Sequence, residues 1–192
     1  MLTPDQRLLL DVPTRFVSER LDFRAVQPGD GAALNTAIAE SARELAEWMP
    51  WARPTPTPEQ TELWVRQAHA KFHAREEFHY LLILRGTSTI VGDVGFHRIV
   101  WSVPLFEMGY WLRTSHTGRG LMTEAASAFT NFGFGTFGAQ RIEIRCDARN
   151  TRSAAVARRA GYVLEGTLRH DSRDADNVLR DSHVFARLRP TP

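Results

Sequence analysis

Two glycines stand where a strand-like segment meets a helical pattern. Residues 105–112 are predicted to form a strand, Gly118 and Gly120 follow in a short loop, and a helical pattern begins at Leu121. Glycine lets backbone N–H groups turn toward one point, and a helix start adds unpaired N–H donors and the positive end of its dipole. The loop therefore predicts a phosphate or pyrophosphate site. The alternative is a tight turn that only leads into a core helix.

Two other phosphate-binding motifs do not fit this loop. A dinucleotide-binding fingerprint needs a third glycine where Thr123 stands, and a P-loop needs Gly-Lys followed by Ser or Thr, which the chain lacks. The prediction therefore depends on loop geometry and not on either of these signatures.

Seven further short motifs follow one another along the chain, and their order matters as much as their residues. They are Trp48–Trp51, Gly92–Phe96, Glu107–Trp111, His116–Ala125, Asn150–Ser153, Arg159–Tyr162 and Leu164–Gly166. Together they resemble the GNAT superfamily of acyl-CoA-dependent N-acetyltransferases, and within it the RimJ/RimL-like group of ribosomal-protein N-acetyltransferases. The resemblance covers residues from about 18 to about 188. It implies acetyl-CoA as co-substrate and no metal.

The resemblance also implies where acetyl-CoA binds. Its pantetheine arm is expected between the strands at 105–112 and 141–146, and Ser115 departs from the Gln or Arg that the family often has there. Backbone amides are expected to hold the pyrophosphate, with Arg113 and Arg119 adding positive charge. The expected cofactor-binding residues are Trp111, Leu112, Arg113, Thr117, Gly118, Arg119, Gly120, Leu121, Met122, Asn150 and Ser153.

Two carboxylates are candidates for the general base that a direct acetyl transfer needs. The resemblance places this role at Glu107, on the strand face opposite Phe106 and Met108. We expect Glu107 to act through a water, with a pKa raised by partial burial; the alternative is a surface glutamate paired with an arginine. Glu165 is the second candidate, assisting the reaction or positioning the amine. Its alternative is a salt-bridged strand end.

The proton donor is less clearly marked. Many relatives use a tyrosine seven residues after the asparagine, where this chain has Ala157. Ser153 and Cys146 are candidates to hydrogen-bond the departing thiolate, and Tyr110 is a further option. Cys146 lies on an apolar strand face, which favours a small core residue over a nucleophile, so no covalent acetyl-enzyme is expected.

The acceptor is expected to be an amine, most directly the α-amino group of a protein N-terminus, as the resemblance implies. Trp48, Trp51 and Tyr110 are the predicted substrate-binding residues, although the two tryptophans could equally anchor the proline-rich loop around them. A polyamine, an amino acid or an aminoglycoside stays possible, because acidic residues lie near the expected acceptor loops: Glu40, Glu44, Glu47 and Glu59. A catalytically idle acyl-CoA-binding module is the alternative from a different class.

The elements that must position these residues follow from periodicity. Strands are predicted over about 20–26, 80–84, 90–99, 105–112, 141–146, 162–168 and 178–188, and helices over about 31–49, 59–72, 121–132 and 152–160. The third helix has an apolar stripe, with polar residues that include Thr130 on the opposite face, and is expected to end in the glycine-rich segment 133–138. The class is α+β. The resemblance implies a mixed, mostly antiparallel twisted sheet of about six to seven strands, flanked by helices, whose diverging central strands form the CoA cleft.

The composition of the chain excludes several classes of protein. The chain has 192 residues, a formal charge of 24 − 22 = +2 and one cysteine, which excludes collagen-like, disulfide-scaffold and wholly disordered classes. We expect a single domain over 1–192 with its core at about 18–188. We also expect a cytoplasmic protein, because residues 1–16 contain no signal or membrane segment. No nucleic-acid or membrane partner is expected from this charge, and a homodimer is expected from the resemblance alone.

Overall fold

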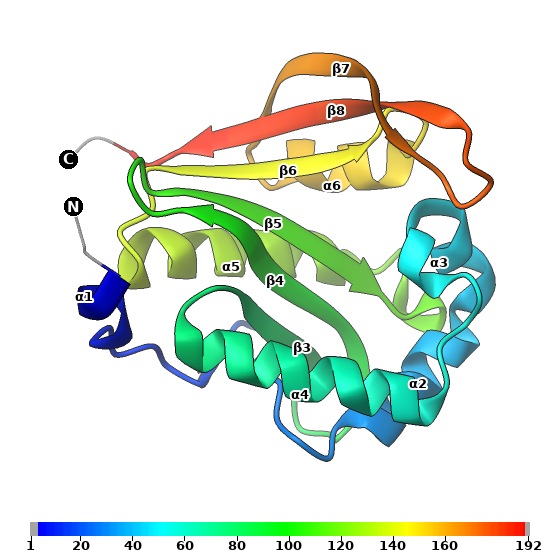
Figure 1. Cartoon of the computed structure of the whole chain (residues 1–192), viewed down its shortest axis with the longest axis horizontal. Helices are drawn as coiled ribbons and strands as arrows, with labels where there is room; N and C mark the ends of the chain where they lie inside the picture. The colour runs from blue at the N-terminus through cyan, green and yellow to red at the C-terminus, as the bar shows by residue number, and fades with distance from the viewer. Residues whose placement is uncertain (1–3, 191–192) are drawn as a thin grey trace.

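One eight-stranded sheet organises the computed structural model, which describes residues 4–190 (Figure 1). The strand order is β1-β2-β3-β4-β5-β6-β8-β7, and every neighbouring pair is antiparallel except β5 and β6. The strands are β1 (Arg15–Val17), β2 (Leu21–Ala25), β3 (Phe78–Leu84), β4 (Ile90–Val100), β5 (Leu105–Leu112), β6 (Arg141–Asp147), β7 (Val163–Arg173) and β8 (Leu179–Leu188).

Helices lie on both faces of the sheet. Figure 1 shows α4 in front of the strands and α5 behind them, with α3 beside the far end of β5. The helical segments are α1 (Pro4–Leu8), α2 (Gly31–Glu40), α3 (Ala42–Trp48), η1 (Pro50–Ala52), α4 (Pro58–Ala74), η2 (Thr114–His116), α5 (Leu121–Thr136) and α6 (Thr151–Arg159). The α+β prediction is confirmed, with eight strands in place of six to seven.

The parallel pair β5 and β6 separates part of the way along its length. The two strands pair from Leu105 with Arg141 to Met108 with Ile144, and then the pairing stops. Beyond this point β5 stays with its antiparallel neighbour β4, while β6 stays with β8 as far as Asp147. Each strand follows its other partner, so a fork opens between the two at the carboxyl end of β5. The expected diverging strands are confirmed.

Apolar side chains fill the space between the sheet and each helical layer. The larger cluster includes Phe96, Phe106 and Phe129, all fully buried, with Phe96 stacked on Phe129 at a ring-centroid distance of 4.3 Å. The second cluster packs α2 and α4 against the opposite face and includes Val65 and Trp111. Burying an aromatic or aliphatic side chain contributes roughly 1.5–3 kcal/mol. The two clusters therefore fix both sides of the strands that form the fork.

Several predicted boundaries differ from the structure. The predicted helix at 31–49 breaks at Ser41, whose buried hydroxyl donates to the carbonyl of Ala37 and accepts from the N–H of Thr114. The helix at 121–132 continues through the glycines to Thr136. Within this extension, Gly133 packs against Phe96 at a distance that a Cβ would prevent. The segments β1 and α1 were not predicted.

The polar face assigned to the third predicted helix is also corrected at one position. Thr130 is fully buried, and its hydroxyl is 2.6 Å from the hydroxyl of Tyr162. Its hydroxyl also donates to the Ala126 carbonyl, so a residue read as solvent-facing is a satisfied polar group in the core.

Candidate active site

A cleft of about 790 Å³ occupies the fork between β5 and β6. The end of β5, the loop before α5 and the first turns of α5 and α6 form its walls. Most of the residues predicted to bind acetyl-CoA are brought together here. The lining includes Tyr110, Trp111, Leu112, Thr117, Gly118, Gly120, Leu121, Met122, Asn150 and Ser153.

The loop before α5 has the conformation that the two glycines predict. Gly118 and Gly120 both have φ of +76°, and Gly120 is the N-cap residue of α5. Within residues 4–190, the N–H groups of Gly118, Arg119 and Gly120 donate to no protein acceptor, and the first N–H groups of α5 have no partner inside the helix. These free donors and the helix dipole suit a pyrophosphate. The loop therefore has the free donors that the predicted pyrophosphate ligand needs.

The two arginines expected to add charge to the loop behave differently. The guanidinium of Arg113 binds the Glu40 carboxylate, which also accepts from the Ser115 N–H. The hydrogen bonds from Arg113 and Ser115 lower the pKa of Glu40 to about 2, so this ion pair persists at neutral pH and occupies Arg113. Arg119 forms no ion pair among the described residues, and its charge is available.

Three polar side chains meet near the start of the fork, on the α6 side. The hydroxyls of Tyr110 and Ser153 are 3.0 Å apart, and Asn150 accepts the Ser153 N–H at 2.9 Å, capping α6. Burial raises the pKa of the Tyr110 hydroxyl, so it stays protonated at neutral pH. Burial likewise raises the pKa of the Cys146 thiol, as expected for a core residue and not for a nucleophile. Tyr110 and Ser153 form a pair of neutral hydroxyl groups beside the cleft.

Glu107 lies on the opposite face of β5, inside a network of charges. Its carboxylate is 3.3 Å from His97 Nε2, 3.2 Å from Arg98 and 3.4 Å from Arg145. Burial alone would raise the pKa of Glu107, but the hydrogen bond from His97 and the charges of His97, Arg145 and Arg98 outweigh it and lower the pKa. The expectation of a raised pKa is wrong, because burial came together with three cationic or protonatable neighbours.

Glu165 lies away from both cleft walls, on β7. Its carboxylate forms a two-point ion pair with Arg141, which lowers the pKa of Glu165. Arg141 also binds Glu143, a carboxylate that is only 5% exposed. The arrangement of Glu165 matches the salt-bridged strand end that the sequence left open as an alternative.

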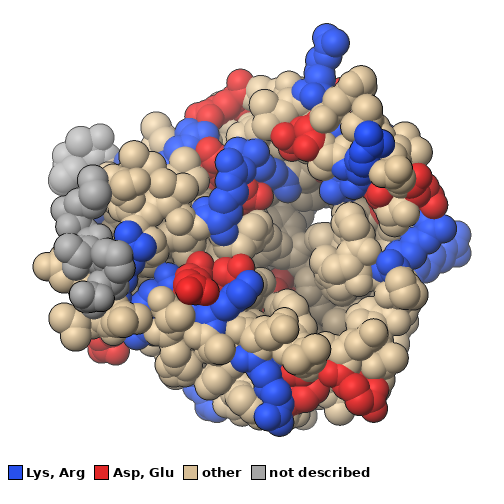
Figure 2. Space-filling model, viewed as in Figure 1, with Lys and Arg blue, Asp and Glu red and all other residues tan. Residues whose placement is uncertain are grey.

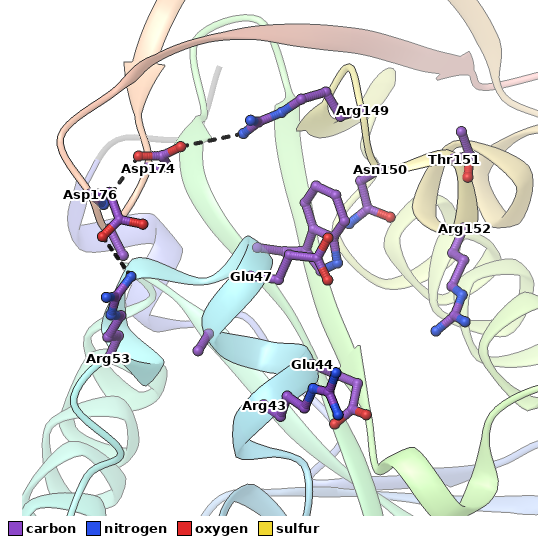
Figure 3. A pocket seen from close by; sticks show the side chains of 13 residues that line it. Arg43, Glu44, Glu47, Arg53, Arg149, Asn150, Thr151, Arg152, Asp174 and Asp176 are labelled. Carbon is purple, nitrogen blue, oxygen red and sulfur yellow. Dashed lines mark hydrogen bonds and ion pairs between the residues drawn. The ribbon is translucent and has the colours of Figure 1, made fainter.

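A second and larger cavity, of about 1060 Å³, adjoins the cleft on the side of α3. Charged side chains from α3, η1, the start of α6 and the β7–β8 turn surround it (Figure 3). Arg53 of the η1 segment binds Asp176 at 2.8 Å, and Arg149 reaches Asp174 at 3.5 Å. Both cavities are lined by Glu44, Trp48, Asn150, Thr151 and Arg152. Figure 2 shows a hollow here with an opening that passes through the molecule.

The residues predicted to bind the acceptor fall in different places. Trp48 lines both cavities, and Tyr110 lines the cleft. Trp51 packs edge-on against Trp111 at a ring-centroid distance of 6.5 Å and is 48% exposed, so it anchors the loop to the sheet. Among the acidic residues, Glu44 and Glu47 line the larger cavity, whereas Glu59 lies in the first turn of α4.

Sequence reasoning missed several charged residues around these cavities. His97, Arg145 and Glu143 join the Glu107 network only through strand register, because His97 pairs with Glu107 and Glu107 pairs with Glu143. The cavity residues Arg43 and Arg149 likewise come from separate segments. An alternating pattern alone places these residues on a face, but it does not say which strand lies next to them.

Two further findings concern the part of the chain that the structure describes. No group of three or more His, Cys, Asp or Glu side chains in residues 4–190 is arranged to hold a metal ion. None of the described helices is long and apolar enough to cross a membrane.

Comparison with known proteins gives a consistent family. A family model described as an acetyltransferase (GNAT) domain matches residues 20–163. The ribosomal-protein-serine acetyltransferase of Escherichia coli (strain K12) is 28% identical over 172 residues, which cover 90% of this chain and 94% of that protein.

Solved structures of the same kind share the fold. One is RimL, a ribosomal L7/L12 alpha-N-protein acetyltransferase in complex with coenzyme A. It has a TM-score of 0.83, 24% identity, and coverage of 92% of this chain and 97% of that one. Another is the microcin C7 self-immunity acetyltransferase MccE in complex with acetyl-CoA and AMP, with a TM-score of 0.84, 21% identity and the same coverage.

Proposed function

The chain belongs to the GNAT acetyltransferase family and is an acetyl-CoA-dependent N-acetyltransferase; from this premise we propose that its acceptor is the α-amino group of a protein N-terminus. We also propose that residues 1–192 form a single N-acetyltransferase domain with its core at about 18–188. The names of similar proteins point in this direction, since the Escherichia coli relative and RimL both act on ribosomal proteins.

The observation that carries the proposal is that the two cavities adjoin and share the lining residues Glu44, Trp48, Asn150, Thr151 and Arg152. A flexible protein N-terminus is an extended chain that can enter the larger cavity of about 1060 Å³ and present its amine at the fork. The carboxylates of Glu44 and Glu47 on the wall favour an approaching ammonium group, and Arg43 and Arg152 offer contacts to backbone carbonyls or acidic side chains. A small polyamine would leave most of this space and these arginines unused.

The proposed acetyl-CoA contacts use the cleft. The free N–H groups from Gly118 to Met122 hold the pyrophosphate, and Arg119 supplies positive charge. The backbone of Trp111 and Leu112, at the β5 edge that β6 has left, pairs with the pantetheine arm as an added strand would. Asn150 and Ser153 lie at the inner end of the cleft. Bound acetyl-CoA supplies an acetyl thioester that a neutral amine can attack.

The proposed reaction uses hydroxyl groups on the cleft side. Ser153, hydrogen-bonded to the protonated Tyr110, donates toward the departing sulfur. It takes the role of the tyrosine that many relatives carry at the position of Ala157 in this chain. On the other face, Glu107 remains ionised and attracts the ammonium form of the acceptor. Glu165, bound to Arg141, supports the strands and does not reach the amine.

Product mass spectrometry tests the acceptor. The enzyme and acetyl-CoA are incubated with a peptide that has a free N-terminus, the same peptide with a blocked N-terminus and one internal lysine, spermidine, an aminoglycoside and free amino acids. The mass gain of one acetyl group on the free N-terminus alone supports the proposal. A gain on spermidine or the aminoglycoside contradicts the acceptor, and coenzyme A binding without transfer to any amine indicates an idle binding module.

A further inference from the structure

His97 lies on β4, beside the point where β5 and β6 separate, and its side chain is on the sheet face opposite that of Tyr110. Strand register pairs His97 with Glu107, so their side chains point to the same face. Trp111, two pairs further along that face, lines the cleft and packs against Trp51. Tyr110 points to the other face, toward Ser153. The imidazole and the hydroxyl pair therefore lie on opposite sides of the same strand.

The imidazole covers the first residue of β5 that β6 no longer pairs. A Cβ at Gly109 would meet His97 Cε1 at 2.7 Å and Nδ1 at 3.2 Å, so glycine leaves the room that the ring needs here. Gly109 follows Met108, the last residue of β5 in the parallel pairing. The ring is thus held at the point where the two strands separate.

The two ring nitrogens of His97 differ in their partners. Glu107 is ionised at neutral pH and can only accept, so Nε2 carries the hydrogen and donates to Oε1 at 3.3 Å. Within residues 4–190, Nδ1 has no hydrogen-bond partner, and the side chain is 38% exposed. Nδ1 therefore presents a free lone pair at an accessible position.

Other charged groups surround the pair on every side. Arg98 on β4 and Arg145 on β6 both contact Glu107, and Glu143 binds Arg145 at 3.1 Å. On the β3 flank, His79 lies against Gly95, and Glu77 before it binds Lys71 of α4. The two arginines hold the Glu107 carboxylate in place and make it a poor proton acceptor. The carboxylate is suited to orient the ring and not to take the proton of the amine.

We propose that His97 is the general base that deprotonates the acceptor ammonium, and that Glu107 is a positioning residue that fixes the ring and its tautomer. This inference rests on the proposed function and assigns a role within the same site. It replaces the expectation that Glu107 itself is the base. Three observations support this assignment: the pairing of His97 with Glu107 in the strand register, the contact of the ring with Gly109, and the absence of a partner at Nδ1 within residues 4–190.

The proposed step balances in protons and charge. His97 Nδ1 takes one proton from the ammonium, directly or through one water, and becomes imidazolium. The freed nitrogen lone pair forms the new N–C bond at the thioester carbonyl as the C–S bond breaks. The second proton leaves the former amine to solvent. The Ser153 and Tyr110 pair passes one proton to the departing sulfur and regains one from solvent. The imidazolium then releases its proton to solvent.

The test measures initial acetylation rates of the free-N-terminus peptide from mildly acidic to mildly alkaline pH. His97→Gln is compared with His73→Gln, a matched substitution on α4 where the imidazole contacts His69 and Phe72 and lines neither cavity, and with His97→Ala in the presence of added imidazole. We expect His97→Gln to lower kcat about 100-fold at neutral pH, with acetyl-CoA binding unchanged by calorimetry. We expect the acetylation rates of the His97 variants to rise with pH, because more of the amine is then already neutral. Added imidazole should raise the rate of His97→Ala and leave the rates of the wild-type and His73→Gln enzymes unchanged.

Different failures have different meanings. If wild-type enzyme transfers acetyl to no N-terminal amine, the proposed function falls. If wild-type enzyme is active and His97→Gln matches it, or if His97→Ala loses activity without any rescue and without a changed pH profile, the base assignment is overturned. Should the His97 variants not fold, Glu107→Gln keeps the imidazole, and we then expect kcat about tenfold lower with an unchanged KM for acetyl-CoA. An unchanged kcat overturns the positioning role.

Discussion

The two sides of the fork use different parts of the chain for recognition. On the cleft side, backbone N–H groups and the neutral hydroxyls of Tyr110 and Ser153 face the ligand. On the proposed acceptor side, charged side chains from separate segments pair with one another around Glu107 and around the larger cavity. The glycine loop of the cleft is specified by local sequence, whereas the other cleft walls and the proposed acceptor side depend on how distant segments are brought together. The first suits one constant co-substrate, and the second can vary with the acceptor.

The largest effect is expected from the hydroxyl pair on the cleft side. We expect the double variant Ser153→Ala with Tyr110→Phe to lower kcat about 100-fold, because a positioned proton donor contributes about that much. The KM for acetyl-CoA should change little, since backbone groups hold the pyrophosphate. Steady-state kinetics with the N-terminal peptide measures both values.

The control for this double variant is Tyr162→Phe. Tyr162 is also a buried tyrosine whose pKa is raised by burial, and its hydroxyl bonds Thr130 away from the cleft. That variant should lose stability while keeping kcat. A double variant with wild-type kcat would show that neither hydroxyl serves the departing sulfur.

A substitution in the loop tests whether backbone geometry binds the co-substrate. Gly120 has φ of +76°, and a β-branched residue there costs about 1–2 kcal/mol. We expect Gly120→Val to weaken acetyl-CoA binding about tenfold in calorimetry. Gly86→Val is the matched control, because Gly86 has φ of +78° in the β3–β4 turn. Equal binding in both variants would remove the loop from the site.

The same contrast explains what the sequence could predict. The glycine loop was predictable, because Gly118, Gly120 and the strand and helix around them lie within one short segment. The fork was expected only from the family resemblance, because it also needs β6. The role of His97 was not, because it needs the register that sets it opposite Glu107 and against Gly109. Glu107 was placed on the correct face, but its lowered pKa depends on Arg145, which comes from another strand. Local patterns carry no information on such pairings.

A smaller effect, on stability, is expected from Glu107. Its pKa is lowered by folding, so its stabilising contribution is present above the unfolded value of about 4.3 and is lost as pH falls through the lower folded value. Glu107→Gln should therefore lower the free energy of unfolding by about 1 kcal/mol at neutral pH. The difference from wild type should shrink below about pH 4.

Denaturant unfolding at several pH values measures this difference. Glu165→Gln is the comparison, because the Glu165 pKa is also lowered but the side chain is 44% exposed, where solvent screens the pair. We expect a smaller loss there. A pH-independent loss in Glu107→Gln would mean that packing, and not charge, accounts for it.

The smallest effect is expected at the mouth of the larger cavity. Arg53 and Asp176 join the η1 segment to the β7–β8 turn through an ion pair whose side chains are 53% and 67% exposed. Exposed ion pairs contribute at most about 1 kcal/mol to stability. The free energies of unfolding of Arg53→Ala, Asp176→Ala and the double variant should therefore lie within about 0.5 kcal/mol of the wild-type value. If these loops shape the acceptor entrance, the KM for the peptide should rise about twofold while the KM for acetyl-CoA stays constant.

A double-mutant cycle isolates the pair, because a coupling seen only in the peptide KM places it at the acceptor entrance. An equal change in both KM values would mean that the two sides of the fork are not separate.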